Sequence, residues 1–250
     1  MRLICSGTTH TGLVRRKNED CLHIDPLHRF FIVADGVGGR KGGEIASRSA
    51  CRFLSMHLPV LWNAIRNRNI RGRKVEKKLS DLLQETSDYV RDVGELESQG
   101  GIGTTLTALL VYGNTGWVMH IGDSRCYIHR NRMGWRQITH DDSLVQSLIE
   151  SGILSGEEKR RFIYRNVITQ ALGLTEDLEP HIYMLNLKKG DFLLLSSDGF
   201  HGFVEEEKWQ YLPVNFLTRR KVREYVETLL NLSLESGGKD NITILGIKVL

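Results

Sequence analysis

The amino-acid sequence predicts an α+β fold in which antiparallel sheets are covered by helices. Strand, helix, strand, helix and strand patterns follow one another along the chain, and the middle strands are too closely spaced for βαβ units. The 250 residues contain only four prolines, with no internal repeat and no Pro-rich linker. We therefore expect a single domain over residues 1–250.

The first half of the chain is expected to form three strands and two long helices. Runs of β-type residues cover 3–8, 21–25 and 30–34, and the short turn with Pro26 between the last two indicates a hairpin. Apolar residues then recur at helical spacing over 42–58 and over 75–93.

The second half is expected to be richer in strands. Turn signals separate residues 104–112, 115–123, 124–130 and 134–139, which predicts an antiparallel meander. The later pattern predicts a mixed, mostly helical region over 143–172, strands over 181–187 and 191–198, a helix over 221–235 and a strand over 241–250.

Composition is typical of a soluble globular protein, with 40% hydrophobic and 26% charged residues. The four cysteines form no Cys-x-x-Cys pair, which argues against a zinc knuckle or a dithiol redox motif and favours a reducing compartment. The amino terminus lacks the apolar core of a signal peptide, and no apolar run approaches the roughly 18 residues of a membrane span. We expect a cytoplasmic protein.

Positive charge is concentrated in residues 66–78, where seven of thirteen residues are Lys or Arg. No aromatic residue interleaves these charges to stack on bases, so nucleic-acid binding is not favoured. A solvated loop leading into a helix is the simpler interpretation. A docking patch for an acidic or phosphorylated partner protein remains open.

Acids lie where four of the predicted strands begin or end. Asp35, Asp123 and Asp198 follow apolar runs, and Asp240 comes just before the last one. A single acid in such a position is usually a turn former, and all four are followed by Gly, Ser or Asn. Carboxylates gathered at one rim of a sandwich would repel one another unless cations neutralised them. Oxygen ligands without cysteine or several histidines favour Mg²⁺ or Mn²⁺ over zinc.

The glycine-rich segment GVGGRKGG, residues 36–43, does not fit the known phosphate-binding loops. A Walker loop requires Ser or Thr after Gly-Lys, whereas Lys41 follows Arg40 and precedes Gly42. The glycine spacing of the dinucleotide fingerprint is also wrong. Metal binding is therefore favoured over nucleotide binding.

Nine short motifs follow one another along nearly the whole chain. They are RRKNED (15–20), VADGVGG (33–39), GGEIAS (42–47), GTT (103–105), IGDSR (121–125), DDSLVQSLIESG (141–152), NVITQALG (166–173), LLLSSDGF (193–200) and KDNIT (239–243). Each is weak alone. In this order the chain resembles the protein phosphatase 2C-like (PPM) metal-dependent Ser/Thr phosphatases, most closely their compact bacterial members.

The resemblance implies a four-layer α-β-β-α sandwich, with two antiparallel sheets flanked by helices and a two-metal site at one rim. It also implies a variable flap around residues 143–170. By resemblance Asp35 bridges the two cations, and the carbonyl of Gly36 helps to hold one of them. Asp198 and Asp240 complete the ligands of the first cation.

Further roles are carried over in the same way. Glu19 serves the second cation, partly through water, with Asp20 as support. Asp123 matches the acid that helps to bind a weaker third ion in bacterial members. Arg15 matches the phosphate-holding arginine, whose planar fork suits two phosphoryl oxygens. The alternative of an ordinary surface arginine is favoured for Arg16.

Physical chemistry gives such a site a mechanism. A water held between two divalent cations, Mn²⁺ or Mg²⁺, loses a proton near neutral pH and attacks phosphorus in line, while the cations screen the phosphoryl charge. No phosphoenzyme is then required.

The sequence departs from the family at two positions. Many eukaryotic members carry a histidine, proposed as general acid, where this chain has Val37, although bacterial members often have an apolar residue there. Asp142 stands where the family commonly has histidine, at the start of the flap. The nearby His140 is interpreted as a structural or solvated loop residue.

Three functions remain in competition. The first is hydrolysis of phosphoserine and phosphothreonine in proteins, which the family's complete set of metal acids favours. The alternative is a catalytically silent regulator of the same fold that binds phosphoproteins. A metal-dependent nuclease is the third. The expected partner is a Ser/Thr kinase or its target, with a monomeric chain and no nucleic acid, and control of a secretion apparatus is only an analogy.

Overall fold

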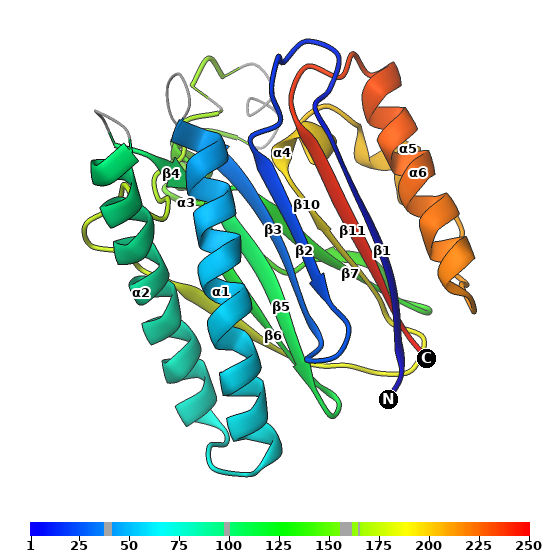
Figure 1. Cartoon of the computed structure of the whole chain (residues 1–250). Coiled ribbons are helices and arrows are strands. Elements are labelled where there is room, and N and C mark those ends of the chain that lie inside the picture. The colour runs from blue at the N-terminus through cyan, green and yellow to red at the C-terminus, as the bar shows by residue number, and fades with distance from the viewer. Residues whose placement is uncertain (38–41, 98–100, 156–161, 165) are drawn as a thin grey trace.

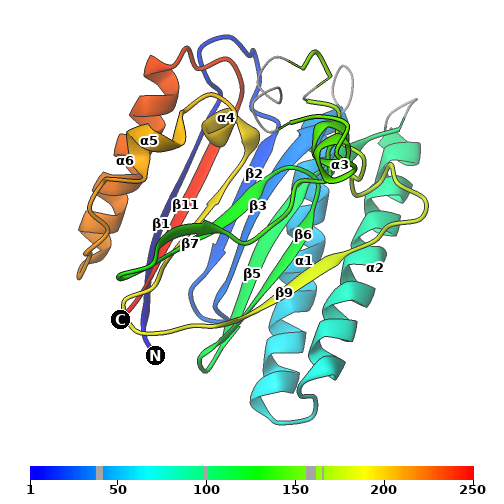
Figure 2. The same cartoon turned by 180° about the vertical axis from the view of Figure 1, so that it is seen from behind.

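Two antiparallel sheets face each other in the computed structural model, and helices cover their outer faces (Figures 1 and 2). The structure describes residues 1–37, 42–97, 101–155, 162–164 and 166–250. Residues 38–41 of the glycine-rich segment and part of the expected flap therefore lie outside the described residues.

The first sheet contains the two terminal strands. In spatial order it consists of β1 (Leu3–His10), β11 (Ile242–Val249), β10 (Phe192–Ser196), β7 (Arg125–Arg130) and β8 (Gly134–Gln137). The second sheet consists of β2 (Asp20–Asp25), β3 (Phe30–Val37), β5 (Leu106–Tyr112), β6 (Thr115–Ile121) and β9 (His181–Asn186), with the short β4 (Gly103–Thr104) paired to β3. Every pairing between these strands is antiparallel, as predicted.

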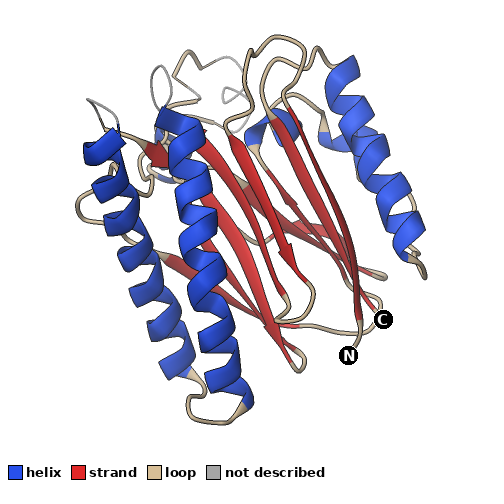
Figure 3. Ribbon diagram, in the orientation of Figure 1, coloured by secondary structure: helices blue, strands red, loops and turns tan. Residues whose placement is uncertain are grey.

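Helices α1 (Gly42–Arg66) and α2 (Arg73–Glu97) cover the second sheet. On the first sheet lie one long helix, α6 (Arg219–Glu235), and the short α4 (Asp198–His201) and α5 (Glu206–Trp209) (Figure 3). The α+β class and the layered arrangement are thus as expected, although the two outer helical layers are unequal.

The continuous apolar run at β3 reflects burial on both of its faces. Phe30 and Ile32 pack in the core beneath α1 and α2, whereas Phe31 and Val33 pack in the core between the two sheets. A strand buried on both sides has no reason to alternate apolar with polar residues. The strand also extends beyond the predicted end at residue 34, because Gly36 and Val37 pair with β4.

The predicted antiparallel meander is wrong. Strands β6 and β7 are consecutive in the sequence, yet β6 belongs to the second sheet and β7 to the first, so the segment forms two hairpins in different sheets. Gly122 at the crossing has φ +96°, a left-handed conformation that favours glycine, and a Cβ there would meet Thr105 at 2.7 Å. A turn signal alone could not reveal this change of sheet.

The expected helical region over 143–172 is helical only in part. Among its described residues, α3 (Leu144–Glu150) is the helix, and the rest is turns and isolated bridges to residues 168 and 172. Ser143 caps α3 by accepting a hydrogen bond from the backbone N–H of Gln146. None of the helices in the described part of the chain is long and apolar enough to cross a bilayer.

Candidate active site

The predicted acids meet at one rim of the sandwich because the antiparallel strands bring their ends together there. Both sheets contribute acids to this rim. On the second sheet, Asp35 lies in β3, Glu19 precedes β2 and Asp123 follows β6. On the first sheet, Asp198 follows β10 and Asp240 precedes β11. A cavity of about 450 Å³ opens at this rim. Its lining includes Arg15, Glu19, Asp35, Asp123, Asp198 and Asp240. We call this group of residues the acidic rim.

Burial and mutual repulsion make ionisation of three rim carboxyls, those of Asp35, Asp123 and Asp198, unfavourable in the metal-free protein. Burial raises the pKa of Asp35 well above its usual value, and the neighbouring carboxylates raise it further. Burial also raises the pKa of Asp123 in the same direction, helped by the charge of Asp198. The pKa of Asp198 rises to about 6, through burial and then through Asp240. A site with these properties favours a ligand that brings positive charge.

Asp20 lies directly beneath the rim and joins the two sheets. It belongs to β2 of the second sheet, where it pairs in register with Asp35. Its Oδ2 accepts hydrogen bonds from Ser197 Oγ, just after β10, at 2.8 Å and from Thr243 Oγ1, in β11, at 2.6 Å, so both donors come from the side of the first sheet. Its Oδ1 has no hydrogen-bond partner among the described residues. Burial raises the pKa of Asp20 to about 7, in spite of these two hydrogen bonds.

Arg15 is the one Lys or Arg among the described residues that line the rim cavity. Its Nη2 donates to Oδ2 of Asp240 at 2.6 Å, and its side chain is 52% exposed. The hydrogen bond to Asp240 raises the pKa of Arg15, so the guanidinium stays charged at the mouth of the cavity.

The backbone around Glu19 and Asp35 is too closely packed for a side chain at position 36. A Cβ on Gly36 would approach the carbonyl oxygen of Gly43 to 2.0 Å and that of Glu19 to 2.7 Å. The N–H of Gly36 donates to the Glu19 carbonyl at 3.1 Å, and Ser47 Oγ donates to the same oxygen at 2.6 Å. Glycine therefore allows β3 to hold Glu19 beside Asp35.

Asn241 positions the loop that carries Arg15 and Glu19, a role that the sequence did not reveal. Its Nδ2 donates to the carbonyl oxygens of Thr11 at 2.9 Å and Lys17 at 2.8 Å. Its Oδ1 accepts from the backbone N–H of Glu19 at 2.8 Å. The motif KDNIT contains this residue, but only a fold that places residue 241 beside residues 11–19 explains the amide.

Two threonines of the GTT motif fix the backbone of Asp35. Thr104 Oγ1 donates to the Asp35 carbonyl at 2.9 Å, and Thr105 Oγ1 accepts from the Asp35 N–H at 3.1 Å. The direction of the Asp35 side chain is thus set by hydrogen bonds from a segment about 70 residues away in the sequence.

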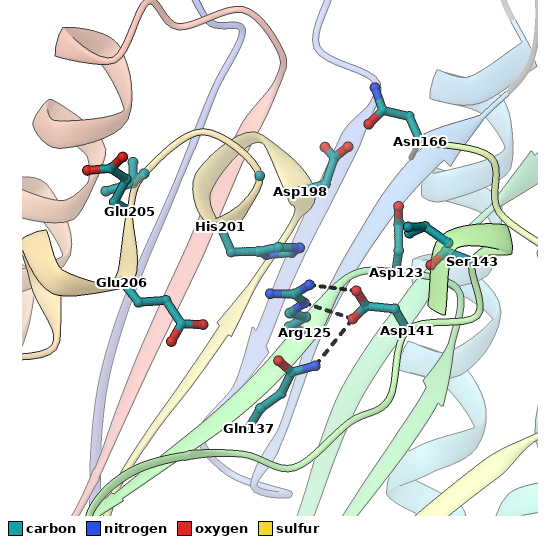
Figure 4. A pocket seen from close by; sticks show the side chains of 13 residues that line it. Asp123, Arg125, Gln137, Asp141, Ser143, Asn166, Asp198, His201, Glu205 and Glu206 are labelled. Atoms are coloured by element: carbon teal, nitrogen blue, oxygen red, sulfur yellow. Dashed lines mark hydrogen bonds and ion pairs between the residues drawn. The ribbon is translucent and has the colours of Figure 1, made fainter. Parts of the chain in front are cut away.

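A side cavity of about 330 Å³ adjoins the rim and shares Asp123 and Asp198 with it (Figure 4). Arg125 forms a two-point ion pair with Asp141, with Nε to Oδ1 at 2.7 Å and Nη2 to Oδ2 at 2.6 Å. Gln137 also donates to Asp141, at 3.2 Å. This wall of the cavity is therefore held in place by its own hydrogen bonds.

Asp142, the second departure from the family pattern, connects the start of the expected flap to the turn before Asp123. Its Oδ2 accepts from the N–H of Gly122 at 2.8 Å, and its Oδ1 lies 2.9 Å from His181 Nε2. The hydrogen bond to Asp142 raises the pKa of His181. His140 contacts Tyr183 and does not line either cavity. Position 142 is therefore an anchor for the turn that carries Asp123.

The residues of the acidic rim fit a hard divalent cation. Apart from Arg15, every residue of the acidic rim offers carboxylate oxygens as possible metal ligands. One oxygen of Asp20 is buried beneath them without a hydrogen-bond partner among the described residues. Within the part of the chain that the structure describes, no group of three or more His, Cys, Asp or Glu side chains is arranged so that it could hold a metal ion by itself. Mg²⁺ does not require such a group, because it keeps several waters and takes only one or two carboxylates directly.

Comparison with known proteins points to one family. The family model for protein phosphatase 2C matches residues 10–242. Protein phosphatase PhpP of Streptococcus pneumoniae is 30% identical over 239 residues, which cover 94% of this chain and 93% of that protein. The crystal structure of the Mycobacterium tuberculosis serine/threonine phosphatase PstP/Ppp superimposes with a TM-score of 0.86 at 32% identity, over 100% of this chain and 99% of that one. A structure of the PstP catalytic domain with two manganese ions gives a TM-score of 0.82 at 32% identity, over 99% of this chain and 98% of that one.

Proposed function

This chain belongs to the protein phosphatase 2C family, and from that premise we propose that it hydrolyses phosphoserine and phosphothreonine in proteins at the acidic rim. The observation that carries the proposal is the meeting of five carboxylates and one arginine in a single cavity of about 450 Å³. Cations and an arginine in one cavity are suited to a phosphoryl group.

We assign two divalent cations, Mn²⁺ or Mg²⁺, to the rim. Asp35 would be shared by the two cations, Asp198 and Asp240 would hold the first with the carbonyl of Gly36, and Glu19 would serve the second. When bound, the cations supply an activated water for in-line attack and neutralise the phosphoryl charge. Support comes from the raised pKa of Asp35, whose charge lacks compensation in the metal-free chain.

Two further acids have weaker or indirect roles in the proposal. Asp123 lines both cavities and would help to hold a third, weaker ion. Asp20 touches no substrate, but its hydrogen bonds to Ser197 and Thr243 keep the two sheets in register beneath the rim.

Arg15 binds the phosphoryl group. The hydrogen bond to Asp240 uses one of the five guanidinium N–H groups, and the side chain stands half exposed at the mouth of the cavity, so other N–H groups can reach a phosphate. Val37 lines the cavity and has no proton to donate, so we assign no side chain as general acid.

A phosphatase of this kind acts on phosphoproteins. We extend the proposal to a cytoplasmic monomer whose substrate is a Ser/Thr kinase or a target of that kinase, on the strength of the family alone. Co-purification of a kinase and its target with the chain tests the substrate, and light scattering of the purified protein tests whether it is a monomer.

The central experiment is a phosphopeptide assay with Mn²⁺ on the parent chain and on Asp35→Asn and Asp198→Asn. We expect a chelator to abolish activity and each substitution to lower kcat/KM by at least about 10³-fold. Asp92→Asn, an exposed acid on α2, is the matched control and should leave activity unchanged.

Two outcomes would contradict the proposal. A metal-loaded parent that binds the phosphopeptide without releasing phosphate would instead support a silent regulator. Cleavage of nucleic acid, lost in the same two variants, would support a nuclease.

A further inference from the structure

A second concentration of charge lies at the end of the sandwich opposite the acidic rim (Figure 1). It consists of Arg66, Arg68, Arg71, Arg73, Lys74, Lys77 and Lys78, at the turn between α1 and α2, and we call it the basic tip. All seven side chains are exposed, and none forms an ion pair with a carboxylate of the described residues. Helix α1 runs 25 residues from the rim to the tip, which is about 36 Å.

The positions of four of these cations are unfavourable for helix α2. Arg73 and Lys74 occupy its first turn, where the positive end of the helix dipole disfavours cations. Arg73 and Lys77 are four residues apart, as are Lys74 and Lys78, and like charges at this spacing repel on a helix surface. Helix stability therefore does not account for these four cations.

Helix α6 shows what a structurally explained set of cations looks like. It also begins with a basic run, but Arg220 and Lys221 lie 2.8 and 2.7 Å from Glu224. Arg223 lies 3.6 Å from Glu227. These cations stabilise their own helix through pairs three or four residues apart. Among the described residues, the cations of the basic tip form no ion pair of this kind.

The shape of the basic tip indicates which class of anionic partner it fits. It is the projecting end of a helical hairpin, and the principal cavities of the described residues are lined by other parts of the chain. An extended or helical peptide held by apolar side chains needs a groove, and residues 66–78 line none of these cavities. Bases need aromatic side chains, which residues 66–78 lack. A broad anionic lipid surface needs only a high density of exposed positive charge.

We propose that the basic tip binds membrane surfaces rich in anionic lipid and holds the acidic rim toward the solvent. The tip and the rim lie a helix length apart at opposite ends of the sandwich (Figure 1), so a membrane bound at the tip leaves the rim facing the solvent. The association is electrostatic and reversible, and added salt weakens it.

Sedimentation with vesicles tests the proposal. The vesicles contain phosphatidylglycerol and phosphatidylcholine in equal parts, or phosphatidylcholine alone. We expect the parent to sediment with the anionic vesicles only, and to be released by about 0.5 M salt. The triple change Arg71→Gln, Arg73→Gln and Lys74→Gln should weaken binding by at least about tenfold.

The matched control is Arg220→Gln, Lys221→Gln and Arg223→Gln on α6, which removes the same residue types and the same formal charge. It should bind within about twofold of the parent. Turnover of a small aryl phosphate should be unchanged in both variants, which shows that each is folded and separates this test from the test of catalysis.

Three results would overturn the proposal. They are failure of the parent to bind anionic vesicles, equal weakening by both triple changes, and tighter binding to polyglutamate or to duplex DNA than to the anionic vesicles.

Discussion

The acidic rim and the basic tip are two ways of concentrating like charge in one chain. The rim carboxyls are half-buried, and desolvation raises the pKa of Asp35 and Asp198. The cations of the tip, such as Arg71 and Lys74, are exposed to water. The difference shows that burial, more than the number of charges, decides how strongly a cluster requires its counter-ion.

This contrast also separates the kinds of ligand. Buried acids in a shaped cavity favour small cations that replace water close to each oxygen. Exposed cations on a projecting hairpin favour an extended partner that is held at a distance through solvent. The following predictions test this contrast, in order of decreasing effect.

The first prediction tests whether Arg15, the cation at the rim, has a different role from an ordinary surface cation. Arg15→Ala should lower kcat/KM on a phosphopeptide by about 10²-fold at saturating Mn²⁺, because it removes the donor assigned to the phosphoryl group. Arg16→Ala, next to it in the sequence, should change kcat/KM less than about twofold. Steady-state kinetics check both values, and equal losses in the two variants would refute the assignment of Arg15.

The backbone should be far less tolerant at the rim than at the tip. Gly36→Ala should lower the free energy of unfolding by about 3 kcal/mol, because the added Cβ meets the Gly43 carbonyl oxygen at 2.0 Å. Gly72→Ala, at φ +55° with open space around it, should cost about 1 kcal/mol. Urea denaturation measures both changes. A Gly36→Ala variant as stable as the parent would show that the rim backbone shifts to accept a Cβ at little cost.

The metal-free rim should make stability fall as pH rises. Asp20 and Asp198 have pKa values of about 7 and about 6 in the folded chain, both above the ordinary 3.8, so the folded state binds protons more tightly than the unfolded state. The stability that these two carboxyls add to the folded chain is complete below about pH 4 and is lost as pH rises toward about 7. With chelator present, the free energy of unfolding should drop by on the order of 2 kcal/mol between about pH 5 and pH 8.

Urea denaturation at several pH values checks this dependence. Asp198→Asn should flatten the curve, and so should Mn²⁺, which binds the ionised carboxylates of the folded state. A metal-free parent whose stability rises over the same range would contradict the assigned pKa shifts.

The smallest effect is expected at the tip. The double change Arg73→Gln and Lys74→Gln should raise the free energy of unfolding by about 0.5 kcal/mol, because it removes cations from the first turn of α2. The corresponding rise in Tm is about 1–2 °C and should fade in high salt. Scanning calorimetry measures it, and a destabilised variant would mean that these cations have a structural role.

Local patterns predicted most of the elements of this fold. The apolar run before Asp35, the Pro26 hairpin and the helical spacing after residue 42 each became the expected element, because each depends on neighbouring residues. The change of sheet at Gly122 could not be predicted, since a turn that reverses a strand and a turn that crosses between sheets use the same residue types.

The charged residues of the site could be predicted from the sequence, but most of the residues that position them could not. Acids at strand boundaries already indicated a shared rim, and the structure brings them to one cavity. The residues that hold this rim, such as Asn241 and Asp142, contact segments that are distant in the sequence or in another layer. Polar residues of this kind look like ordinary loop residues until the fold is known.

The hydrogen bonds of Asp20 across the two sheets limit how this fold can exchange parts with its relatives. Asp35 belongs to one sheet and Asp198 follows a strand of the other, so neither sheet carries a complete site. A chimera that takes one sheet from a homologue must therefore inherit Asp20, Ser197 and Thr243 as a compatible set. For this reason, we expect viable recombination points to follow these contacts rather than the boundaries between helices and strands.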